Sequence, residues 1–287
     1  DYPLSLTHTQ AALYADDTAL LIAHRSLQEA ELLANNELEV TSQWFKRNKL
    51  LLNTKKTKYV VFASNRKVVP ETCGLYIGGN AIEKLNAHTY LGVTLDSSFH
   101  WATHIDHLCK KLSFGCFTLF KARKYFNLQT LRILYFNVFH SHLTYCIESW
   151  GYTYASYCSV VSILQKRAVR TIASAPKNAP STELFRNLNI MPFNVVRQYK
   201  SATLVHKIIY KNIPYHSSVL VKPRCNTRQA EQKNLNLPVV HNVYGRRSIS
   251  YVGAKIWNTI PSLIKCLPNI APSLKRLFLS GSYQSPY

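Results

Sequence analysis

The chain has 287 residues and 47% of them are hydrophobic, so it can bury a sizeable core and form two or three structural units. It carries 35 Lys and Arg against 14 Asp and Glu, a formal net charge of +21, and few acidic residues follow Asp106. A basic region that cannot neutralise itself by internal ion pairs predicts a polyanionic partner. No run of eighteen apolar residues occurs and the first residues do not resemble a signal peptide, which excludes a membrane span and predicts a protein that is not secreted.

Residues 11–23 are two short apolar runs separated by Asp16 and Asp17. This pattern predicts a buried β-hairpin with the two aspartates at its tip. Ser26 followed by Glu29 is typical of a capping box and predicts a helix that runs to about residue 49. Four short apolar segments then predict strands or a hairpin: 50–52, 59–62, 75–82 and 90–95. Strands mixed with one helix predict an α+β fold for this part of the chain.

Beyond Asp96 the pattern changes to long periodic apolar stretches with few Gly or Pro. Residues 99–175 therefore predict packed helices, and prolines at 176, 180 and 192 indicate a junction. A further helix is expected at about 192–211, followed by a segment rich in Pro and Asn.

The seven cysteines form no CxxC pair, so neither a disulfide framework nor a zinc knuckle is expected. Cys109 and Cys116 are one heptad apart and could share a helix face with His104 and His107. A metal site there is one interpretation, and core packing of free thiols is the favoured one.

The Asp-Asp pair is the strongest candidate for chemistry. Synthesis of a polynucleotide uses two divalent cations that activate a 3′-hydroxyl and stabilise the leaving pyrophosphate. Oxygen ligands on a rigid tip suit this task, and Mg²⁺ takes few protein ligands besides water and substrate phosphates. An isolated Asp-Asp pair is more often a solvated turn, but its place between apolar runs, two residues after Tyr14, favours a metal site.

The segment Tyr14-Ala15-Asp16-Asp17 resembles the YADD box of reverse transcriptases, particularly those of Jockey-like non-LTR retrotransposons. The resemblance implies that Asp16 and Asp17 are catalytic ligands of two Mg²⁺ ions, with Mn²⁺ as an alternative. The Asn-rich and Lys-rich segment 48–58 resembles the family's next motif, in which Lys56 would protonate the departing pyrophosphate. A solvated basic loop explains the lysines about equally well.

The segment Tyr90-Leu91-Gly92 and the residue after it resemble the hairpin that grips the primer terminus. Gly92 would permit a close backbone approach there, although a core strand with one glycine explains the pattern equally well. The resemblance makes Tyr14, Tyr90, Leu91 and Gly92 candidate nucleic-acid contacts. Two lysines of the helical region are added as candidate phosphate contacts: Lys110 and Lys111.

The resemblance extends through Tyr244-Gly245-Arg246-Arg247-Ser248 and 257–261 to nearly the whole chain. It implies part of a polymerase palm at 1–95, a helical thumb-like domain at 96–175, and a mixed, mostly helical retrotransposon C-terminal region at 176–287. The implied partners are an RNA template, a DNA primer and deoxynucleoside triphosphates, in the nucleus or a cytoplasmic ribonucleoprotein.

The pattern departs from the family at one point. The family's site also uses an aspartate on an earlier strand, whereas the only acidic residue before Tyr14 is Asp1. We therefore expect that these 287 residues alone do not polymerise. The alternative function is a non-catalytic basic nucleic-acid-binding relic of a transposon, and a helical interaction domain with incidental charge is a third interpretation.

Overall fold

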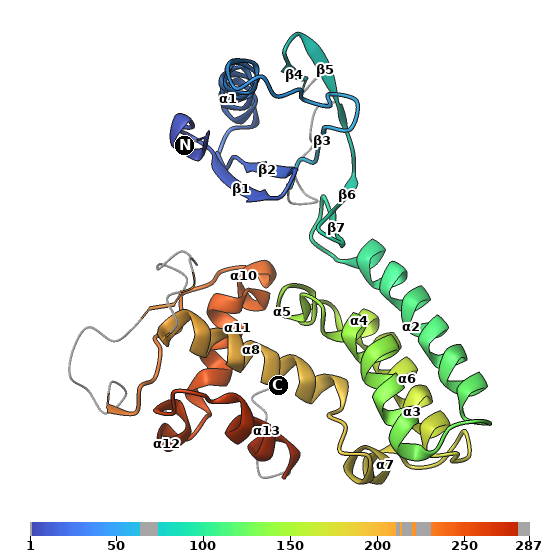
Figure 1. Cartoon of the computed structure of the whole chain (residues 1–287). Coiled ribbons are helices and arrows are strands. Elements are labelled where there is room, and N and C mark those ends of the chain that lie inside the picture. Colours follow the sequence, from blue (N-terminus) through green and yellow to red (C-terminus); the bar gives the residue numbers. More distant parts are fainter. Residues whose placement is uncertain (1, 64–73, 211–212, 214–219, 222–230, 281–287) are drawn as a thin grey trace. The chain divides into compact units, whose positions relative to one another are not determined.

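The computed structural model describes residues 2–63, 74–210, 213, 220–221 and 231–280. It divides into two compact units, residues 1–99 and 100–287, each of which is described by itself (Figure 1). The first unit holds ten Lys and Arg and ten Asp and Glu, so the whole net charge of +21 belongs to the second. The finer division into 1–95, 96–175 and 176–287 stays a prediction.

The first unit contains one long helix and small β-sheets, in agreement with the predicted α+β pattern (Figure 1). The elements are η1 (Tyr2–Ser5), β1 (Gln10–Tyr14), β2 (Asp17–Leu21), α1 (Leu27–Arg47), β3 (Lys58–Tyr59), β4 (Leu75–Ile77), β5 (Asn80–Lys84), β6 (Ala87–Tyr90) and β7 (Val93–Asp96). Strands β1 and β2 pair with each other, as do β6 and β7, and the order of the third sheet is β3-β5-β4. Within these sheets only the short β3–β5 pair is parallel.

Helix α1 begins where the sequence predicts. The Ser26 side chain accepts a hydrogen bond from the Glu29 backbone N–H at 3.4 Å, which satisfies one free donor of the first turn. The helix ends two residues earlier than predicted, because Lys49 adopts a positive φ of 57°. Leu38 of α1 forms a small core with Ile77 and Ile82, so one apolar stripe of the helix covers the β4–β5 hairpin.

One predicted strand of this unit is absent and another is shorter than predicted. Residues 50–52 form no strand: the Leu50 N–H bonds to the Phe45 carbonyl and finishes the end of α1, and the Leu51 side chain is fully exposed. The strand predicted at 59–62 is reduced to its first residue, because its pairing with β5 ends at Tyr59 and Lys84. Apolar content alone cannot produce a strand where no neighbouring strand supplies a ladder.

Helix α1 also fixes the chain that leads into β1. The buried Glu37 carboxylate accepts the backbone N–H groups of Thr7 and His8 at 3.1 and 3.0 Å and the Thr7 hydroxyl at 2.9 Å. Burial by itself raises the pKa of Glu37, but these hydrogen bonds outweigh it and hold the pKa below its usual 4.5. The carboxylate form therefore stabilises the first unit.

We expect Glu37→Gln to destabilise the first unit at pH 7 by about 1–2 kcal/mol, because charge-assisted hydrogen bonds are lost. Because the pKa of Glu37 is lower in the folded state than its usual 4.5, its carboxylate stabilises the folded unit above pH 4.5. This stabilisation is lost as the pH falls through the lower folded-state pKa. Hydrogen exchange of the α1 amides at pH 7 and at about pH 4 measures both effects. The exposed Glu39→Gln serves as the control; an equal effect of the two substitutions would contradict the assignment.

The second unit is helical throughout its regular elements, as predicted for 99–175 and for about 192–211 (Figure 1). Its elements are α2 (Ala102–Ala122), α3 (Leu128–Tyr135), the π-helical turn η2 (Phe136–His140), α4 (Ser141–Thr144), α5 (Ile147–Trp150), α6 (Ala155–Ile172), α7 (Ser181–Asn187), α8 (Phe193–Tyr210), α10 (Val243–Arg247), α11 (Ile249–Asn258), α12 (Ser262–Lys265) and α13 (Ala271–Leu279). Helix α2 packs along α6, and α8 packs against α11 and α13. One core cluster joins these helices.

A single buried glutamine links three segments of this core. The Gln165 side chain donates to the Tyr135 hydroxyl at 3.0 Å and to the Met191 carbonyl at 2.9 Å, and it accepts the Phe193 N–H at 2.6 Å. Gln165 and Tyr135 are fully buried and cannot reach water, so their polar groups depend on these hydrogen bonds. The network connects α6 to α3 and to the start of α8.

We expect Gln165→Leu to destabilise the second unit by roughly 2–5 kcal/mol, because it leaves three buried polar groups without their partner. Urea unfolding of the chain, followed by circular dichroism at the helical band, gives the difference. Arg167→Leu, at an exposed position of the same helix, should stay within about 0.5 kcal/mol. Equal midpoints for the glutamine variant and the parent chain would contradict a structural role for Gln165.

Two of the four predicted cluster residues of α2, Cys116 and His104, lie in the core, whereas His107 is exposed. Cys116 is buried, and its thiol lies 3.5 Å from the Leu164 carbonyl. His104 lies against Trp150, and its burial lowers its pKa to about 4. Nowhere in the described part of the chain do three His, Cys, Asp or Glu side chains form a group that could hold a metal ion. None of the helices in that part is long and apolar enough to cross a membrane.

Candidate functional site

The Asp-Asp pair lies at the tip of a two-stranded hairpin, as predicted. Tyr14 pairs with Asp17 across the ladder, which leaves Ala15 and Asp16 as the two turn residues. Ala15 has a positive φ of 52°, a conformation that a two-residue hairpin turn demands and that residues other than glycine adopt at a cost. Asp16 is thus in the turn and Asp17 begins β2, with both side chains exposed.

The prediction that this hairpin is buried is wrong. Strand β1 is exposed at four of its five residues, and Leu13 and Leu21 are about half exposed. The apolar sequence predicts burial, yet within the described residues the two strands pair only with each other. Leu20 is the exception, since it packs against the core beneath α1 and so attaches β2 to the first unit.

A second hairpin lies against the first. The Tyr90 hydroxyl donates to the Ala12 carbonyl of β1 at 3.3 Å, so the end of β6 touches the strand that leads to the Asp-Asp tip. The segment predicted as one continuous strand at 90–95 instead contains the end of β6, a two-residue turn and most of β7. Leu91 and Gly92 have φ values of 46° and 77°, which a two-residue turn of the mirror-image type requires. A continuous core strand is therefore wrong and a hairpin is present, while its contact with a primer stays a prediction.

Lys56 lies in a compact turn. Its backbone N–H donates to both the carbonyl and the side-chain oxygen of Asn53, and Thr57 donates to the same carbonyl. The asparagine thus closes the turn and leaves the Lys56 side chain exposed. Neighbouring Lys58 pairs with Glu83 on β5, which removes it as a free cation. The proton-donor role of Lys56 stays a prediction.

Two exposed adjacent carboxylates fit part of a magnesium site. Mg²⁺ is commonly bound by one or two carboxylates together with water and substrate phosphates. Asp16 and Asp17 can supply that share. A third protein ligand does not come from the described residues, since none of their acidic, His or Cys side chains joins the pair in a group of three. The residues therefore fit an incomplete two-ion site.

Lys110 and Lys111 lie on the exposed side of α2, and aromatic side chains follow them along the helix. Phe114 and Phe117 are 69% and 54% exposed, although a phenyl ring normally seeks a core. Lys121 lies over the Phe117 ring at 5.4 Å. Cations beside accessible rings are typical of surfaces that bind nucleic acid through phosphate contacts and stacking.

Comparison with known proteins shows which proteins this chain resembles. The chain is 26% identical over 207 residues to the RNA-directed DNA polymerase from mobile element jockey of Drosophila melanogaster, a match that covers 68% of this chain and 22% of the relative. It is 27% identical over 186 residues to the probable RNA-directed DNA polymerase from transposon BS of the same organism, covering 62% and 20%. The probable polymerase from transposon X-element matches at 23% over 194 residues, or 66% and 21%.

All three relatives are named as RNA-directed DNA polymerases of mobile elements or transposons. The chain is similar to these reverse transcriptases of Jockey-like non-LTR retrotransposons, and it spans about a fifth of the length of the relatives it matches. No family model and no solved structure matches it. The predicted resemblance to this family is thereby confirmed, whereas the roles of Tyr14, Asp16 and Asp17 stay predictions.

Two features of the structure have no counterpart in the sequence predictions. Glu37, which fixes the entry to β1, looks like an ordinary helix-surface acid in the sequence. Arg197 lies on α8 beside a cavity of the second unit, and no motif marks it. Arg247, which also lines that cavity, belongs to the Tyr-Gly-Arg-Arg-Ser segment, so the family resemblance was the one signal that pointed to it.

Proposed function

We propose that this chain supplies part of the active centre and most of the duplex-binding surface of a retrotransposon reverse transcriptase. The observation that carries the proposal is the Tyr14–Asp17 hairpin, which exposes two adjacent carboxylates beside the β6–β7 turn. On this proposal the first unit is the C-terminal part of a polymerase palm. The α2–α6 helices would form the thumb.

Each exposed residue of the tip would have one task. Asp16 and Asp17 would hold Mg²⁺, and Tyr14, 65% exposed on the same tip, would contact the primer–template duplex. Gly92 adds no side chain to the β6–β7 turn, so that a primer strand could approach the backbone at that residue. When bound, the metal would activate the 3′-hydroxyl and offset the charge of the leaving pyrophosphate. Lys56 would give that pyrophosphate a proton.

We further propose that the 287 residues alone do not extend a primer. Two carboxylates from one tip cannot hold two ions between them, and the described residues add no third ligand. A primer-extension assay with an RNA template, a DNA primer, deoxynucleotides and Mg²⁺ tests this directly. Template-dependent extension by the isolated chain would refute it.

The alternative is a non-catalytic nucleic-acid-binding protein derived from a transposon. It is favoured by the charge, since all of the net +21 lies in residues 100–287 and none in the unit that holds the Asp-Asp tip. Both functions predict binding to an RNA–DNA duplex. They differ at the tip, because the alternative gives Asp16 and Asp17 no metal to bind. Mn²⁺-induced broadening of the amide signals of the β1–β2 turn, absent in Asp16→Asn, would favour the polymerase.

A further inference from the structure

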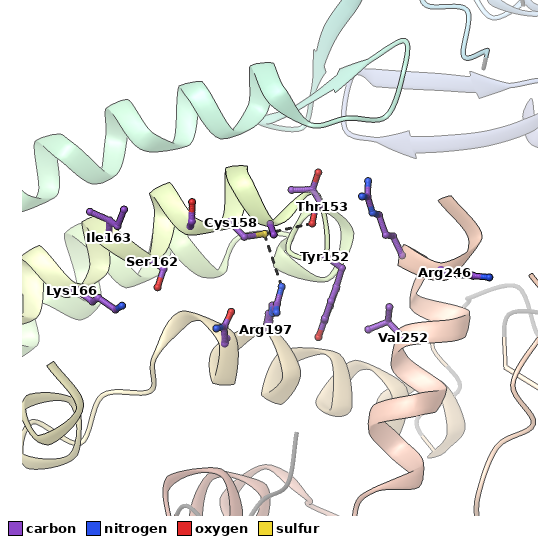
Figure 2. Close-up of a pocket in the computed structure, with 13 residues that line it drawn as sticks. Tyr152, Thr153, Cys158, Ser162, Ile163, Lys166, Arg197, Arg246 and Val252 are labelled. Carbon is purple, nitrogen blue, oxygen red and sulfur yellow. Dashed lines mark hydrogen bonds between the residues drawn. The ribbon is translucent and has the colours of Figure 1, made fainter. Parts of the chain in front are cut away.

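The second unit contains a basic cavity that the proposed polymerase function does not use. It has a volume of about 520 Å³ and lies between α6, α8 and the α10–α11 segment (Figure 2). Its cationic residues come from each of these elements: Lys166, Arg197, Arg246 and Arg247. None of the described residues that line it is acidic.

Two of these arginines have donors without partners. Arg197 uses one terminal nitrogen to donate to the Gly151 carbonyl at 2.9 Å, whereas its Nε is buried and makes no hydrogen bond to the described residues. One terminal nitrogen of Arg247 is likewise buried and unpaired there. A buried, unsatisfied donor is unfavourable, and an unfilled anion site is one of the few reasons for it to persist.

Aromatic rings hold both guanidinium groups in place. The Arg247 guanidinium lies 3.7 Å from the centre of the Tyr154 ring, and that of Arg197 lies 5.0 Å from the centre of the Tyr152 ring. In Figure 2, Arg197 rises from α8 next to Tyr152 and Cys158, while Lys166 projects from α6. Stacking fixes the plane of a guanidinium without using its N–H donors, so these donors stay available for an anion.

The cavity is larger than one phosphate and has apolar as well as cationic walls. Tyr152, Ile163 and Val252 line it together with the hydroxyl of Ser162. Helix α6 begins at its edge with Ala155, which places the positive end of a helix dipole there. A charged head group with an attached organic part matches this combination better than a bare ion does.

We infer that this cavity binds a phosphate group carried by a nucleotide, either at the end of a nucleic-acid strand or as a free nucleotide. Arg197 and Arg247 would form bidentate hydrogen bonds to the phosphate oxygens, and Lys166 would add charge. Guanidinium groups match the geometry of phosphate, which explains the choice of arginine at the two stacked positions. The inference concerns the second unit and does not depend on Asp16 or Asp17.

Calorimetric titration of the whole chain at low ionic strength, with inorganic pyrophosphate as the probe, tests the inference. We expect saturable binding at one site, weakened about tenfold or more in the double variant Lys166→Gln, Arg247→Gln. The matched control, Lys177→Gln with Arg186→Gln, removes the same charge at exposed positions outside the cavity and should bind within about twofold of the parent. The conservative Arg197→Lys keeps the charge but loses the fork, and should also bind more weakly.

Two short oligoribonucleotides, one with a 5′-phosphate and one with a 5′-hydroxyl, separate the sources of the phosphate. Preference for the phosphorylated strand, lost in the cavity variant, identifies a strand end. Equal binding of the two strands, with pyrophosphate binding intact, identifies a free nucleotide.

Absence of saturable pyrophosphate binding, equal weakening in the cavity and control variants, or equally tight binding of a short polyglutamate peptide would overturn the inference. Asp16→Asn should leave all of these titrations unchanged, so this test and that of the polymerase can fail separately.

Discussion

Asp16→Asn is expected to abolish DNA synthesis by a jockey polymerase in which the matching segment is replaced by this chain. The carboxylate lies in the two-residue turn of the β1–β2 hairpin, where no neighbouring side chain shields it. An amide cannot offer the negative charge that a divalent ion requires, so we expect a loss of at least about 10²-fold in the rate of primer extension. The same loss is expected for Asp17→Asn.

The matched control is Thr18→Val, which alters the next exposed residue of β2 without removing a carboxylate. It should retain activity within a few fold. RNA–DNA duplex affinity, measured in parallel, should be the same for the parent chimera and both aspartate variants, since the acidic tip gives no attraction to phosphate. Synthesis that survives Asp16→Asn would contradict the metal role and favour the non-catalytic alternative.

Binding of the isolated chain to an RNA–DNA duplex should weaken steeply with salt. Residues 100–287 carry the entire net charge, and the described lysines of α2 at 110 and 111 are exposed. Each neutralised phosphate releases condensed counterions, so six or more contacts predict a loss of about 10³-fold between roughly 50 and 200 mM salt. Fluorescence anisotropy of a labelled duplex across that range gives the slope of log affinity against log salt.

The double variant Lys110→Gln, Lys111→Gln should reduce that slope by about two, since each phosphate contact contributes about one. The pair Lys177→Gln, Lys207→Gln removes equal charge from exposed positions outside α2 and tests whether α2 matters specifically. An identical slope for the two pairs would mean that charge acts only diffusely. Affinity that does not change with salt would instead favour the interaction-domain interpretation.

The sequence predictions were correct where the structure of a segment depends only on its own residues. The side chain of Ser26 caps the first turn of α1, and Gly78 and Gly79 adopt the positive φ angles of the β4–β5 turn. The helices of the second unit follow from apolar periodicity, since a helix completes its backbone hydrogen bonds within one segment. The Tyr14–Asp17 box was likewise recognisable, because a two-residue hairpin turn needs no distant partner.

Predictions failed where a strand needed a partner. Leu50–Leu52 are as apolar as a true strand, but no ladder reaches them, and Tyr90 ends a strand that the pattern continued through Leu95. Strand formation depends on neighbours that are distant in sequence, so composition cannot decide it. The burial predicted for β1 and β2 failed for the same reason.

The resemblance to reverse transcriptases, the acidic tip and the basic character of the second half could be predicted from the sequence alone, since these follow from residue identity and short spacing. Contacts between distant residues become visible in the folded chain. The tertiary structure placed Glu37 on the backbone of Thr7 and His8, and it brought the Tyr90 hydroxyl to Ala12. It also gathered Lys166, Arg197 and Arg247 around one cavity. Such contacts depend on how helices and hairpins pack in three dimensions, so no local sequence pattern predicts them.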